Sequence, residues 1–380
     1  MRQRTRITIG VDARTVFCPE RRGTGKNLVD LYPRIAELRP DWQFVMYYEQ
    51  EGFADPFSGI ANISKKRIRM KGARWNLWEN LRLPLAARSD KVDLLHCPAQ
   101  SMPRLKLIPI IATIHDIIPL RFDAGGGGNA FKKSERVIRN SLLRSDAVLT
   151  VSHFSKSDMS DYFRVNGENI HVLTWAPDSQ LCIATTGEIE QVRKKYGINK
   201  PYLFTFGATD PRKNTFRVIE AFARMKQNDV DGQLVISGIR DDRSAVYRQK
   251  AIAFGVEDDV VFCGFAPDSE IPALLCGAEG LVFASLYEGF GLPLIDAMAC
   301  NTPALASNVT SLPEVAGDAV LYCDPLSVDS IACGMTEIMT CEKTRARLRE
   351  QGAKKVKEYT WERTAKTVLN VFEKVLEVHS

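Results

Sequence analysis

The chain has 380 residues, 45% of them hydrophobic, which is enough to build the cores of two α/β domains of ordinary size. Its nine cysteines form no Cys-x-x-Cys pair and its net charge of +5 accompanies no nucleic-acid module, so we expect reduced thiols, a cytoplasmic protein and no nucleic-acid partner. The N-terminus lacks the hydrophobic region of a cleavable signal, and the longest apolar stretch, residues 107–120, is too short to cross a bilayer.

The first half of the chain alternates short apolar runs with amphipathic stretches, which is the pattern of a parallel sheet wound with helices. Strands are predicted near residues 7–11, 44–48, 92–96, 110–114, 147–151 and 170–173. A helix is predicted over residues 24–38, at the glycine-rich turn Arg22-Gly23-Thr24-Gly25. This turn is neither a Walker loop nor a complete dinucleotide fingerprint, so by itself it is a weak signal of phosphate binding. We expect an N-terminal Rossmann-like domain over residues 1–178.

Residues 61–106 are unusually basic, with eleven Lys and Arg against three acidic residues. They include Lys65, Lys66, Arg67, Arg69, Lys71 and Arg74, followed by Trp75 and Trp78. Cations bind phosphates and indoles favour the membrane interface, so one interpretation is a surface that lies on anionic lipid or binds a phosphorylated acceptor. The alternative, solvated strand edges with core tryptophans, explains the same residues equally well.

His115 and Asp116 follow the apolar strand at 110–114, which delivers them to the carboxyl edge of the first sheet. Ligands of doubly wound sheets bind at this edge, and a neutral imidazole can hydrogen-bond a hydroxyl group there. A buried histidine at the end of a strand is the structural alternative. The four glycines at 125–128 predict either a mobile loop that closes over substrate or a plain spacer.

Residues 179–200 lose the strand rhythm and are predicted as a linker with a short helix over 188–196. A second series of strands follows near residues 202–206, 234–237, 260–263, 281–284, 304–306 and 320–323. It predicts a second Rossmann-like domain over residues 201–358. The chain ends in an amphipathic helix over 361–378, for which Thr360 is the predicted N-cap.

Two cations, Arg212 and Lys213, lie in a turn after the first strand of the second domain. The turn runs Gly207-Ala208-Thr209-Asp210-Pro211-Arg212-Lys213-Asn214. At the carboxyl edge of a sheet, adjacent Arg and Lys side chains can offset the charge that grows on a departing nucleoside diphosphate. A solvent-exposed basic turn is the structural alternative.

The most informative segment is Glu288-Gly289-Phe290-Gly291-Leu292-Pro293-Leu294-Ile295-Asp296, between a buried strand and a helix. Its glycines let the chain approach a ligand closely, and backbone amides at a helix N-terminus favour a diphosphate. Glu288 in the loop and Asp296 eight residues later add two carboxylates, and this spacing indicates a nucleotide-sugar pocket. The alternative is a capped turn before a core helix, as in any α/β enzyme.

Metal and cofactor motifs are missing from the sequence. The five histidines show no ligand spacing, so we expect no metal site and no cofactor. Arg212, Lys213 and the loop amides would act in place of a metal ion. The sequence also lacks an obvious Ser-His-Asp or Cys-His constellation, which argues against a hydrolase.

The Glu288 segment resembles the family 4 retaining glycosyltransferases of the GT-B fold. The resemblance extends from Val11-Asp12-Ala13-Arg14 to Tyr359-Thr360-Trp361-Glu362 and is most specific in the second half. It implies two Rossmann-like domains facing across a cleft, with the segment 359–380 crossing back to pack on the first domain. Asp296 stands where the family usually has Glu, and Asn301 where it usually has Gly, a change that the left-handed preference of Asn makes harmless.

The resemblance also implies a role for each candidate residue on the donor side. Glu288 would bind sugar hydroxyls and Asp296 the ribose, while Gly207, Arg212 and Lys213 would hold the diphosphate. The remaining donor-loop candidates are Gly289, Phe290, Gly291 and Leu292.

In the N-terminal domain, the resemblance places His115 near the transferred sugar. Asp116 would orient the acceptor or His115. Gly23 and Gly25 would face the diphosphate and the acceptor, although a tight structural turn explains these glycines equally well.

The sequence as a whole is most similar to bacterial mannosyltransferases that build surface polysaccharide. This similarity implies retaining, metal-independent transfer of mannose from GDP-mannose, a substrate, to a glycan or lipid-linked oligosaccharide at the inner face of the plasma membrane. A UDP-sugar-dependent transferase of the same fold and a non-catalytic nucleotide-binding protein are the open alternatives. A dinucleotide-dependent oxidoreductase is disfavoured, because neither opening turn carries the full glycine fingerprint.

Overall fold

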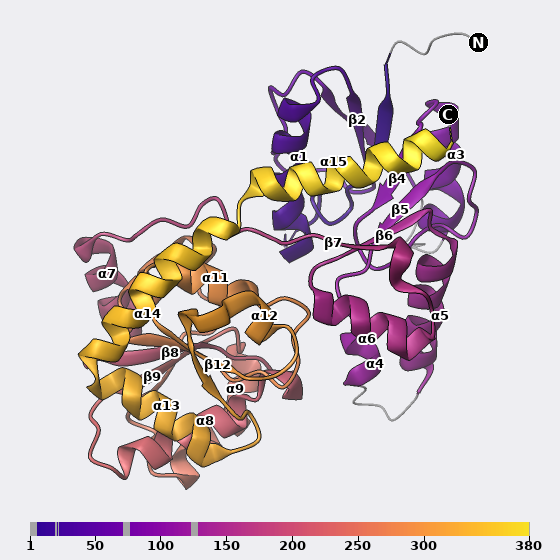
Figure 1. Cartoon of the computed structure of the whole chain (residues 1–380). Coiled ribbons are helices and arrows are strands. Elements are labelled where there is room, and N and C mark those ends of the chain that lie inside the picture. Colours follow the sequence, from indigo (N-terminus) through magenta and orange to yellow (C-terminus); the bar gives the residue numbers. More distant parts are fainter. Residues whose placement is uncertain (1–5, 20, 22, 71–76, 123–127, 380) are drawn as a thin grey trace. The chain divides into compact units, whose positions relative to one another are not determined.

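The computed structural model describes residues 6–19, 21, 23–70, 77–122 and 128–379 (Figure 1). The chain divides into two compact units, of which unit 1 comprises Met1–Asp178 with Thr360–Ser380 and unit 2 comprises Ser179–Tyr359. Residues 179–200, predicted as a linker, therefore lie in unit 2, and the C-terminal segment lies in unit 1.

The centre of unit 1 is a seven-stranded parallel sheet with the order β3-β2-β1-β4-β5-β6-β7. Its strands are β1 (Thr8–Asp12), β2 (Gln43–Tyr48), β3 (Ile63–Arg67), β4 (Leu94–Cys97), β5 (Ile110–Thr113), β6 (Ala147–Thr150) and β7 (Ile170–Val172). The strand order changes direction at β1, between β2 and β4. Doubly wound sheets bind ligands at the carboxyl ends of the strands beside such a switch point.

The helices of unit 1 connect these parallel strands. They are α1 (Gly23–Leu38), the π-helix η1 (Trp78–Arg82), α3 (Leu83–Ser89), α4 (Ile118–Arg121), α5 (Asn129–Arg144), α6 (His153–Phe163), the 3-10 helix η2 (Gly167–Asn169) and α15 (Trp361–Val378). The six strands predicted for this half are confirmed, each within two residues of its predicted bounds, and so is the helix after the first strand.

The edge strand β3 was not predicted, because its five residues contain a single apolar side chain, Ile63. Edge strands commonly carry lysines that discourage pairing with another sheet. Lys65 and Lys66 are exposed, and the Nζ atom of Lys66 lies 2.6 Å from Oδ1 of Asp90. For this part of the basic segment, the interpretation as a solvated strand edge is correct.

Other residues of the basic segment also have structural roles. Trp78 is fully buried, and its Nε1 donates to the Ile68 carbonyl at 3.0 Å, so this tryptophan belongs to the core. Arg67 forms an ion pair with Glu51. Lys71, Arg74 and Trp75 lie outside the described residues, as do the glycines at 125–127.

The centre of unit 2 is a six-stranded parallel sheet with the order β10-β9-β8-β11-β12-β13. Its strands are β8 (Tyr202–Phe206), β9 (Gln233–Ser237), β10 (Val260–Phe262), β11 (Gly280–Phe283), β12 (Ala304–Ser307) and β13 (Leu321–Cys323). All six were predicted. Because β8 pairs directly with β11, the turn after β8 and the loop after β11 begin side by side at one edge of the sheet.

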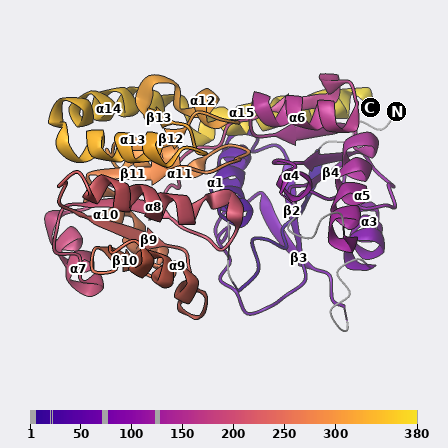
Figure 2. The same ribbon diagram turned by 90° about the horizontal axis from the view of Figure 1, so that it is seen from below.

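The helices of unit 2 cover both faces of its sheet. They are α7 (Thr186–Tyr196), η3 (Pro211–Lys213), α8 (Thr215–Lys226), α9 (Asp241–Ala253), η4 (Asp268–Glu270), α10 (Ile271–Cys276), α11 (Leu292–Ala299), α12 (Leu312–Ala316), η5 (Gly317–Ala319), α13 (Val328–Thr340), α14 (Glu342–Lys355) and η6 (Val356–Glu358). Figure 1 shows α11 and α12 on one side of the strands and α8, α9 and α13 on the other. In Figure 2, α13 lies between α14 and α8, on both of which it packs.

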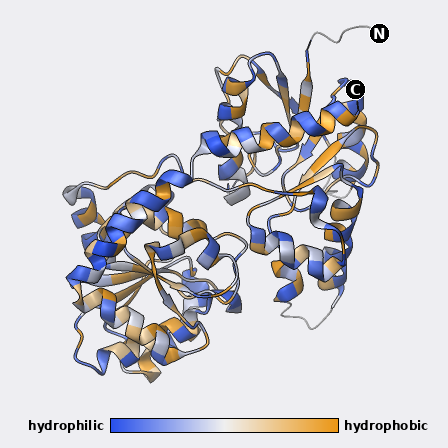
Figure 3. Ribbon diagram, in the orientation of Figure 1, coloured by the Kyte–Doolittle hydropathy of each residue, from blue (hydrophilic) through white to orange (hydrophobic). Residues whose placement is uncertain are grey.

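The alternation of side chains along each strand explains these two layers. Leu203 of β8 packs in the cluster that contains α8, α9 and α13, whereas its neighbours Tyr202 and Phe204 pack with α10 and α11. A strand that is buried on both faces is largely apolar, and Figure 3 shows hydrophobic colouring along the inner strands of both sheets. Among the described residues, no helix has both the length and the apolar content that spanning a bilayer requires.

The last helix, α15, packs along α1 in unit 1. Nε1 of Trp361 donates to the Pro177 carbonyl at 2.8 Å, and the fully buried Phe372 meets the His96 ring edge-on at 5.5 Å. The helix begins at the predicted N-cap, Thr360, whose hydroxyl accepts the Arg363 amide at 3.2 Å.

We expect Thr360→Ala to lower the free energy of unfolding of unit 1 by about 1 kcal/mol, because it removes the acceptor for an amide of the first turn. Thr367→Ala is the matched control: this mid-helix hydroxyl only donates to the Arg363 carbonyl, and its loss should change the free energy by less than about 0.5 kcal/mol. Urea unfolding of the three proteins measures the difference. Equal effects of the two substitutions would contradict the capping role.

Candidate functional site

The turn after β8 is held in place by its own backbone and by two neighbouring strands. Gly207 lies so close to β9 that a Cβ atom would meet Ile236 Cγ2 at 2.6 Å. Asp210 caps η3 by accepting the Arg212 amide at 2.9 Å. Asn214 has a left-handed φ of 61°, and its buried amide donates to the carbonyls of Ala284 and Pro325 at 2.9 and 2.7 Å. The conformation of the Arg212-Lys213 turn is therefore fixed against the end of β11.

Both predicted cations contact the predicted carboxylate. Nη1 of Arg212 and Nζ of Lys213 each lie 2.7 Å from Oε1 of Glu288, and the three side chains are only 10–17% exposed. Arg212 also donates to the Tyr287 carbonyl at 2.8 Å and pairs with Asp210 at 3.3 Å. The structure thus brings together the two cations and the carboxylate that the sequence predicted for one site, although Lys213 and Glu288 are 75 residues apart in the chain.

The charges of this cluster balance, since two cations face the carboxylates of Asp210 and Glu288. An anion that binds here therefore competes with Glu288 for Arg212 and Lys213. Such competition frees the Glu288 carboxylate for a neutral hydrogen-bonding group beside the anion. The cluster is suited to a ligand that joins a diphosphate to a polyol.

The loop after β11 leads directly into α11. Gly291, the N-cap of α11, has φ 107°, and a Cβ atom would lie 2.6 Å from Leu312 Cδ2, so only glycine fits there. Gly289 precedes it, and Leu292 is the first residue of the helix. The side chain of Phe290 is 6% exposed and meets the Tyr359 ring edge-on at 5.8 Å, so this residue can offer a ligand only its backbone. The loop amides lie at the positive end of the α11 dipole.

Asp296 lies on the second turn of α11. Residues one turn apart share a helix face, and Asp296 is half-buried like Leu292 and Pro293, whereas Leu294, Ile295 and Ala297 are buried. Its side chain therefore lies on the face of α11 that the core leaves partly uncovered. This placement is compatible with the ribose role implied by the resemblance.

His115 is the best-defined candidate of unit 1. Its backbone amide donates to Oε1 of Gln100 at 3.0 Å, and its Nε2 lies 3.0 Å from the Pro98 carbonyl and 3.3 Å from the Thr24 hydroxyl. Because a carbonyl only accepts, Nε2 carries the ring proton and Nδ1 is the acceptor. Desolvation lowers the pKa of His115 to about 4, so the imidazole is neutral at physiological pH.

The other candidates of unit 1 have visible structural tasks. Oδ1 of Asp116 accepts the Ile118 amide at 3.0 Å and so starts α4, and its backbone carbonyl accepts from Gln100. A Cβ atom at Gly25 would lie 2.0 Å from the Thr15 carbonyl oxygen, so the α1 turn requires glycine there, whereas nothing lies within 4 Å of a Cβ atom at Gly23. Arg22 lies outside the described residues.

Sequence reasoning missed a buried polar cluster at the carboxyl end of β1. Arg14 donates to both oxygens of Asp12, lies 3.4 Å from Glu79 and stacks over Trp78 at 4.3 Å. Burial raises the pKa of Glu79. The four residues join η1 to the end of β1, although they are spread over two segments whose sequences give no sign of the contact.

A second missed contact crosses the same sheet. Nδ1 of His96 lies 2.7 Å from the Tyr32 hydroxyl and Nε2 lies 2.8 Å from the Thr113 hydroxyl, while the ring is 2% exposed. Burial lowers the pKa of His96 from 6.5 to about 3.

The pKa of His96 predicts a loss of stability in mild acid. The unfolded chain takes up a proton below its pKa of 6.5 and the folded chain does not until about 3, so the free energy of unfolding should fall through this window by up to about 1.4 kcal/mol per pH unit. Urea unfolding at pH 7 and pH 5 measures the slope. His96→Gln keeps hydrogen-bonding atoms without a titrating group and should reduce the proton uptake on unfolding by about one; an unchanged slope would show that His96 is not the source.

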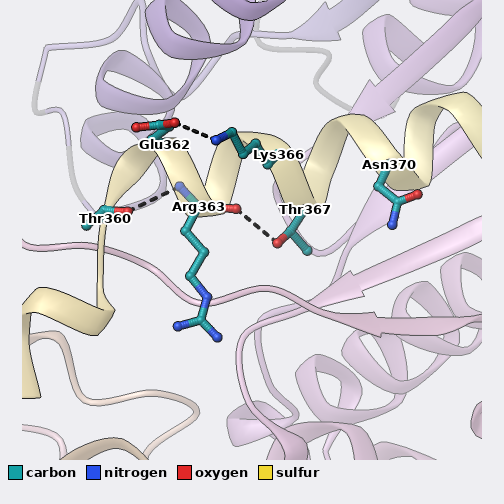
Figure 4. Close-up of a pocket in the computed structure, with 6 residues that line it drawn as sticks. All are labelled: Thr360, Glu362, Arg363, Lys366, Thr367 and Asn370. Atoms are coloured by element: carbon teal, nitrogen blue, oxygen red, sulfur yellow. Dashed lines mark hydrogen bonds and ion pairs between the residues drawn. The ribbon is translucent and has the colours of Figure 1, made fainter.

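Figure 4 shows a cavity beside the last helix, α15. It has a volume of about 520 Å³ and is lined by the N-cap Thr360 and by Glu362, Arg363, Lys366, Thr367 and Asn370 of the helix. Glu362 and Lys366, one turn apart on the helix, pair with each other at 2.5 Å. It contains none of the predicted site residues. In the described part of the chain, no three His, Cys, Asp or Glu side chains gather as metal ligands would.

Two family models match the chain. The model described as Glycosyltransferase Family 4 matches residues 15–175, and the model of Glycosyl transferases group 1 matches residues 188–355. O-antigen chain mannosyltransferase B of Escherichia coli is 27% identical over 365 residues, which are 92% of this chain and 95% of that protein. O-antigen chain mannosyltransferase RfbU of Salmonella typhimurium is 27% identical over 285 residues, 73% of this chain and 74% of the relative.

Solved structures agree on the fold. Anabaena HepE, crystallised with UDP and glucose, has a TM-score of 0.74 at 17% identity, and the match covers 97% of this chain and 100% of that one. The two family models together account for most of the sequence, one in each unit. The chain belongs to the family 4 and group 1 glycosyltransferases of the GT-B fold.

Proposed function

We propose that this glycosyltransferase moves mannose from GDP-mannose, with retention and without a metal ion, to a glycan or lipid-linked oligosaccharide in surface polysaccharide synthesis. The observation that carries the proposal is the meeting of Arg212, Lys213 and Glu288 beside the N-terminus of α11. Support for mannose comes from the relatives, two of which are named O-antigen chain mannosyltransferases.

In the proposed site, Arg212, Lys213 and the loop amides of residues 289–292 bind the diphosphate, and Gly207 allows its close approach. Glu288 accepts hydrogen bonds from sugar hydroxyls, and Asp296 accepts them from the ribose. These are charge-assisted bonds in a partly dehydrated site, where they are stronger than in water.

The unit 1 residues serve the sugar and the acceptor. Nδ1 of the neutral His115 accepts a hydrogen bond from a hydroxyl of the transferred sugar. Asp116 keeps the His115 segment in place by starting α4, and Gly23 with Gly25 forms the turn at the start of α1. The role of Asp116 in orienting the acceptor is indirect in this scheme.

In the transfer step, the bond between the anomeric carbon and the diphosphate oxygen breaks and a bond to the acceptor oxygen forms on the same face. The acceptor proton passes to the leaving diphosphate, which Arg212 and Lys213 stabilise as its negative charge grows. No redox step or further co-reactant is needed. This scheme fits a site in which cations and amides surround the leaving group.

The nearest alternative is a UDP-sugar donor, which HepE supports because it was crystallised with UDP and glucose. A non-catalytic nucleotide-binding protein is the second alternative, suggested by Asp296 in place of Glu. The cation and carboxylate cluster favours an enzyme, because binding of a nucleotide alone does not require Glu288 beside the diphosphate.

We propose that peripheral contact with an anionic membrane is made by residues 77–88, from the N-cap of η1 into α3. Leu77, Leu81 and Leu85 recur every four residues and are 42, 40 and 46% exposed, with Arg82 and Arg88 exposed beside them. Such an apolar and basic helix face suits the interface of an anionic bilayer. Leu81→Asp should weaken binding to anionic vesicles; equal binding of the parent protein to anionic and neutral vesicles would reject this contact.

The first experiment is release of nucleoside diphosphate from a panel of GDP-, UDP- and ADP-sugars, with and without EDTA, for the parent protein and Glu288→Ala. We expect release from GDP-mannose that resists EDTA and disappears in the variant. Release from a UDP-sugar instead would select the alternative donor. Binding of a nucleoside diphosphate without release, when a glycan acceptor is supplied, would favour the binding protein.

A further inference from the structure

Two hydroxyl groups of the β12–α12 connection hold the loop that carries Glu288. Oγ1 of Thr310 accepts the Glu288 amide at 3.2 Å. The hydroxyl of Ser311 lies 2.8 Å from the Glu288 carbonyl and 3.0 Å from the Phe290 carbonyl, and its single proton is shared between these two acceptors. Ser311 has no exposed surface. The side chains of one loop thus fix three backbone groups of the next.

Because the peptide bond is planar, these contacts also determine the direction in which the N–H groups of the loop point. In a trans peptide, the C=O of one residue and the N–H of the following residue point in opposite directions. Because Ser311 draws the carbonyls of Glu288 and Phe290 towards itself, the N–H groups of Gly289 and Gly291 point away from Ser311. These are the amides assigned above to the diphosphate.

The backbone of Thr310 is held in a conformation that its side chain disfavours. Its φ is 59°, and among the described residues it is the one β-branched side chain in the left-handed region. A β-branched residue there is strained, and such strain persists where the surroundings dictate it, often at functional sites. A glycine would relieve the strain but would remove the acceptor for the Glu288 amide.

We propose that Thr310 and Ser311 are positioning residues for donor binding, with Thr310 setting the Glu288 carboxylate against the sugar and Ser311 aiming the loop amides at the diphosphate. The proposal rests on the proposed function. Neither residue needs to touch the donor, since each acts through the Glu288–Gly291 loop.

The two roles predict different effects of substitution, one on the binding of the nucleoside diphosphate and one on turnover. Ser311→Ala should raise the Kd of free GDP, or of the nucleoside diphosphate that the donor panel selects, by about five- to tenfold, the usual effect of one hydrogen bond. Thr310→Gly should lower kcat by about tenfold and change that Kd by less than about threefold. Because Gly relieves a left-handed φ, Thr310→Gly should melt no lower than the parent, and Thr310→Ser should recover kcat.

Ser307→Ala is the matched control. The hydroxyl of Ser307 is also fully buried and also donates to a backbone carbonyl, that of Ser285 at 2.7 Å. Ser285 precedes the Glu288 loop, so this hydrogen bond does not hold the loop itself. Ser307→Ala should lower the melting temperature much as Ser311→Ala does and leave the Kd and kcat unchanged.

Isothermal titration with the nucleoside diphosphate, donor kinetics and thermal melting of the five proteins test the proposal. An active parent whose Ser311→Ala variant binds as tightly as Ser307→Ala, or whose Thr310→Gly variant keeps full kcat, overturns the positioning roles alone. Loss of kcat in Thr310→Ser as well as Thr310→Gly would assign the effect to the methyl group and also overturn the role of the hydroxyl. A parent that neither binds nor releases a nucleoside diphosphate overturns the proposed function itself.

Discussion

Replacing Glu288 with Gln should lower kcat/KM for the sugar donor by about 100-fold, the value of a charge-assisted hydrogen bond of about 3 kcal/mol. Oε1 of Glu288 accepts from Nζ of Lys213 at 2.7 Å and forms an ion pair with Nη1 of Arg212 at 2.7 Å. Gln keeps the shape of the side chain and an oxygen for the two cations, but it has no charge and replaces the second carboxylate oxygen with an amide nitrogen. The variant therefore loses the carboxylate that accepts from the sugar hydroxyls, while Arg212 and Lys213 remain to bind the diphosphate.

The expected pattern separates this role from a general loss of structure. Binding of the free nucleoside diphosphate should be unchanged or tighter in Glu288→Gln, because the carboxylate no longer competes for the cations. Glu279→Gln is the matched control, since Glu279 pairs with Arg345 at 3.2 Å in the same unit and lies outside the cluster. Wild-type donor kinetics in Glu288→Gln, or a similar loss in Glu279→Gln, would contradict the assignment.

The fold was accessible from sequence because its strands are buried on both faces. Runs such as Ile110–Thr113 and Gly280–Phe283 are buried throughout and almost entirely apolar, so their positions could be predicted to within two residues. The exception, Ile63–Arg67, lies at an edge and carries charges that only its pairing with β2 explains. Edge strands are specified by their neighbours more than by their own pattern.

The site was accessible only in part, for a similar reason. Arg212, Lys213 and Glu288 lie in turns at the carboxyl ends of adjacent strands, so a parallel sheet alone predicts that they approach each other. Thr310 and Ser311 have no such signal, because their task depends on a left-handed φ and on carbonyl directions in another loop. Sequence patterns report side-chain types, whereas these contacts depend on backbone orientation.

The glycines illustrate the same limit. Gly25 and Gly23 were equivalent candidates in the sequence, yet the Thr15 carbonyl excludes any side chain at Gly25 and nothing crowds Gly23. Asp116 likewise gave no sequence signal for the turn that it stabilises before α4, where its carboxylate accepts the Ile118 amide. Local packing thus distinguishes structural residues from ligand-binding candidates of the same type.

Lys213→Ala should lower kcat by about 100-fold and raise the Kd of the intact donor by a much smaller factor. Nζ of Lys213 is shared between Glu288 at 2.7 Å and the face of the Phe283 ring at 4.7 Å, in a side chain that is 17% exposed. In the ground state, Arg212 and the loop amides also neutralise the diphosphate, so one cation adds little. As the glycosidic bond breaks, negative charge grows on the leaving oxygen, and a cation held in a partly dehydrated site then contributes most.

Lys226→Ala is the matched control for this substitution. Lys226 is 20% exposed and pairs with Asp259 at 2.9 Å at the end of α8, outside the cluster, so its loss should affect stability without affecting kcat. Single-turnover release of the nucleoside diphosphate, combined with donor titration, separates the chemical step from binding. An unchanged kcat with only weaker donor binding in Lys213→Ala would show that this cation binds the ground state and the transition state equally, and that Arg212 and the α11 amides alone stabilise the departing diphosphate.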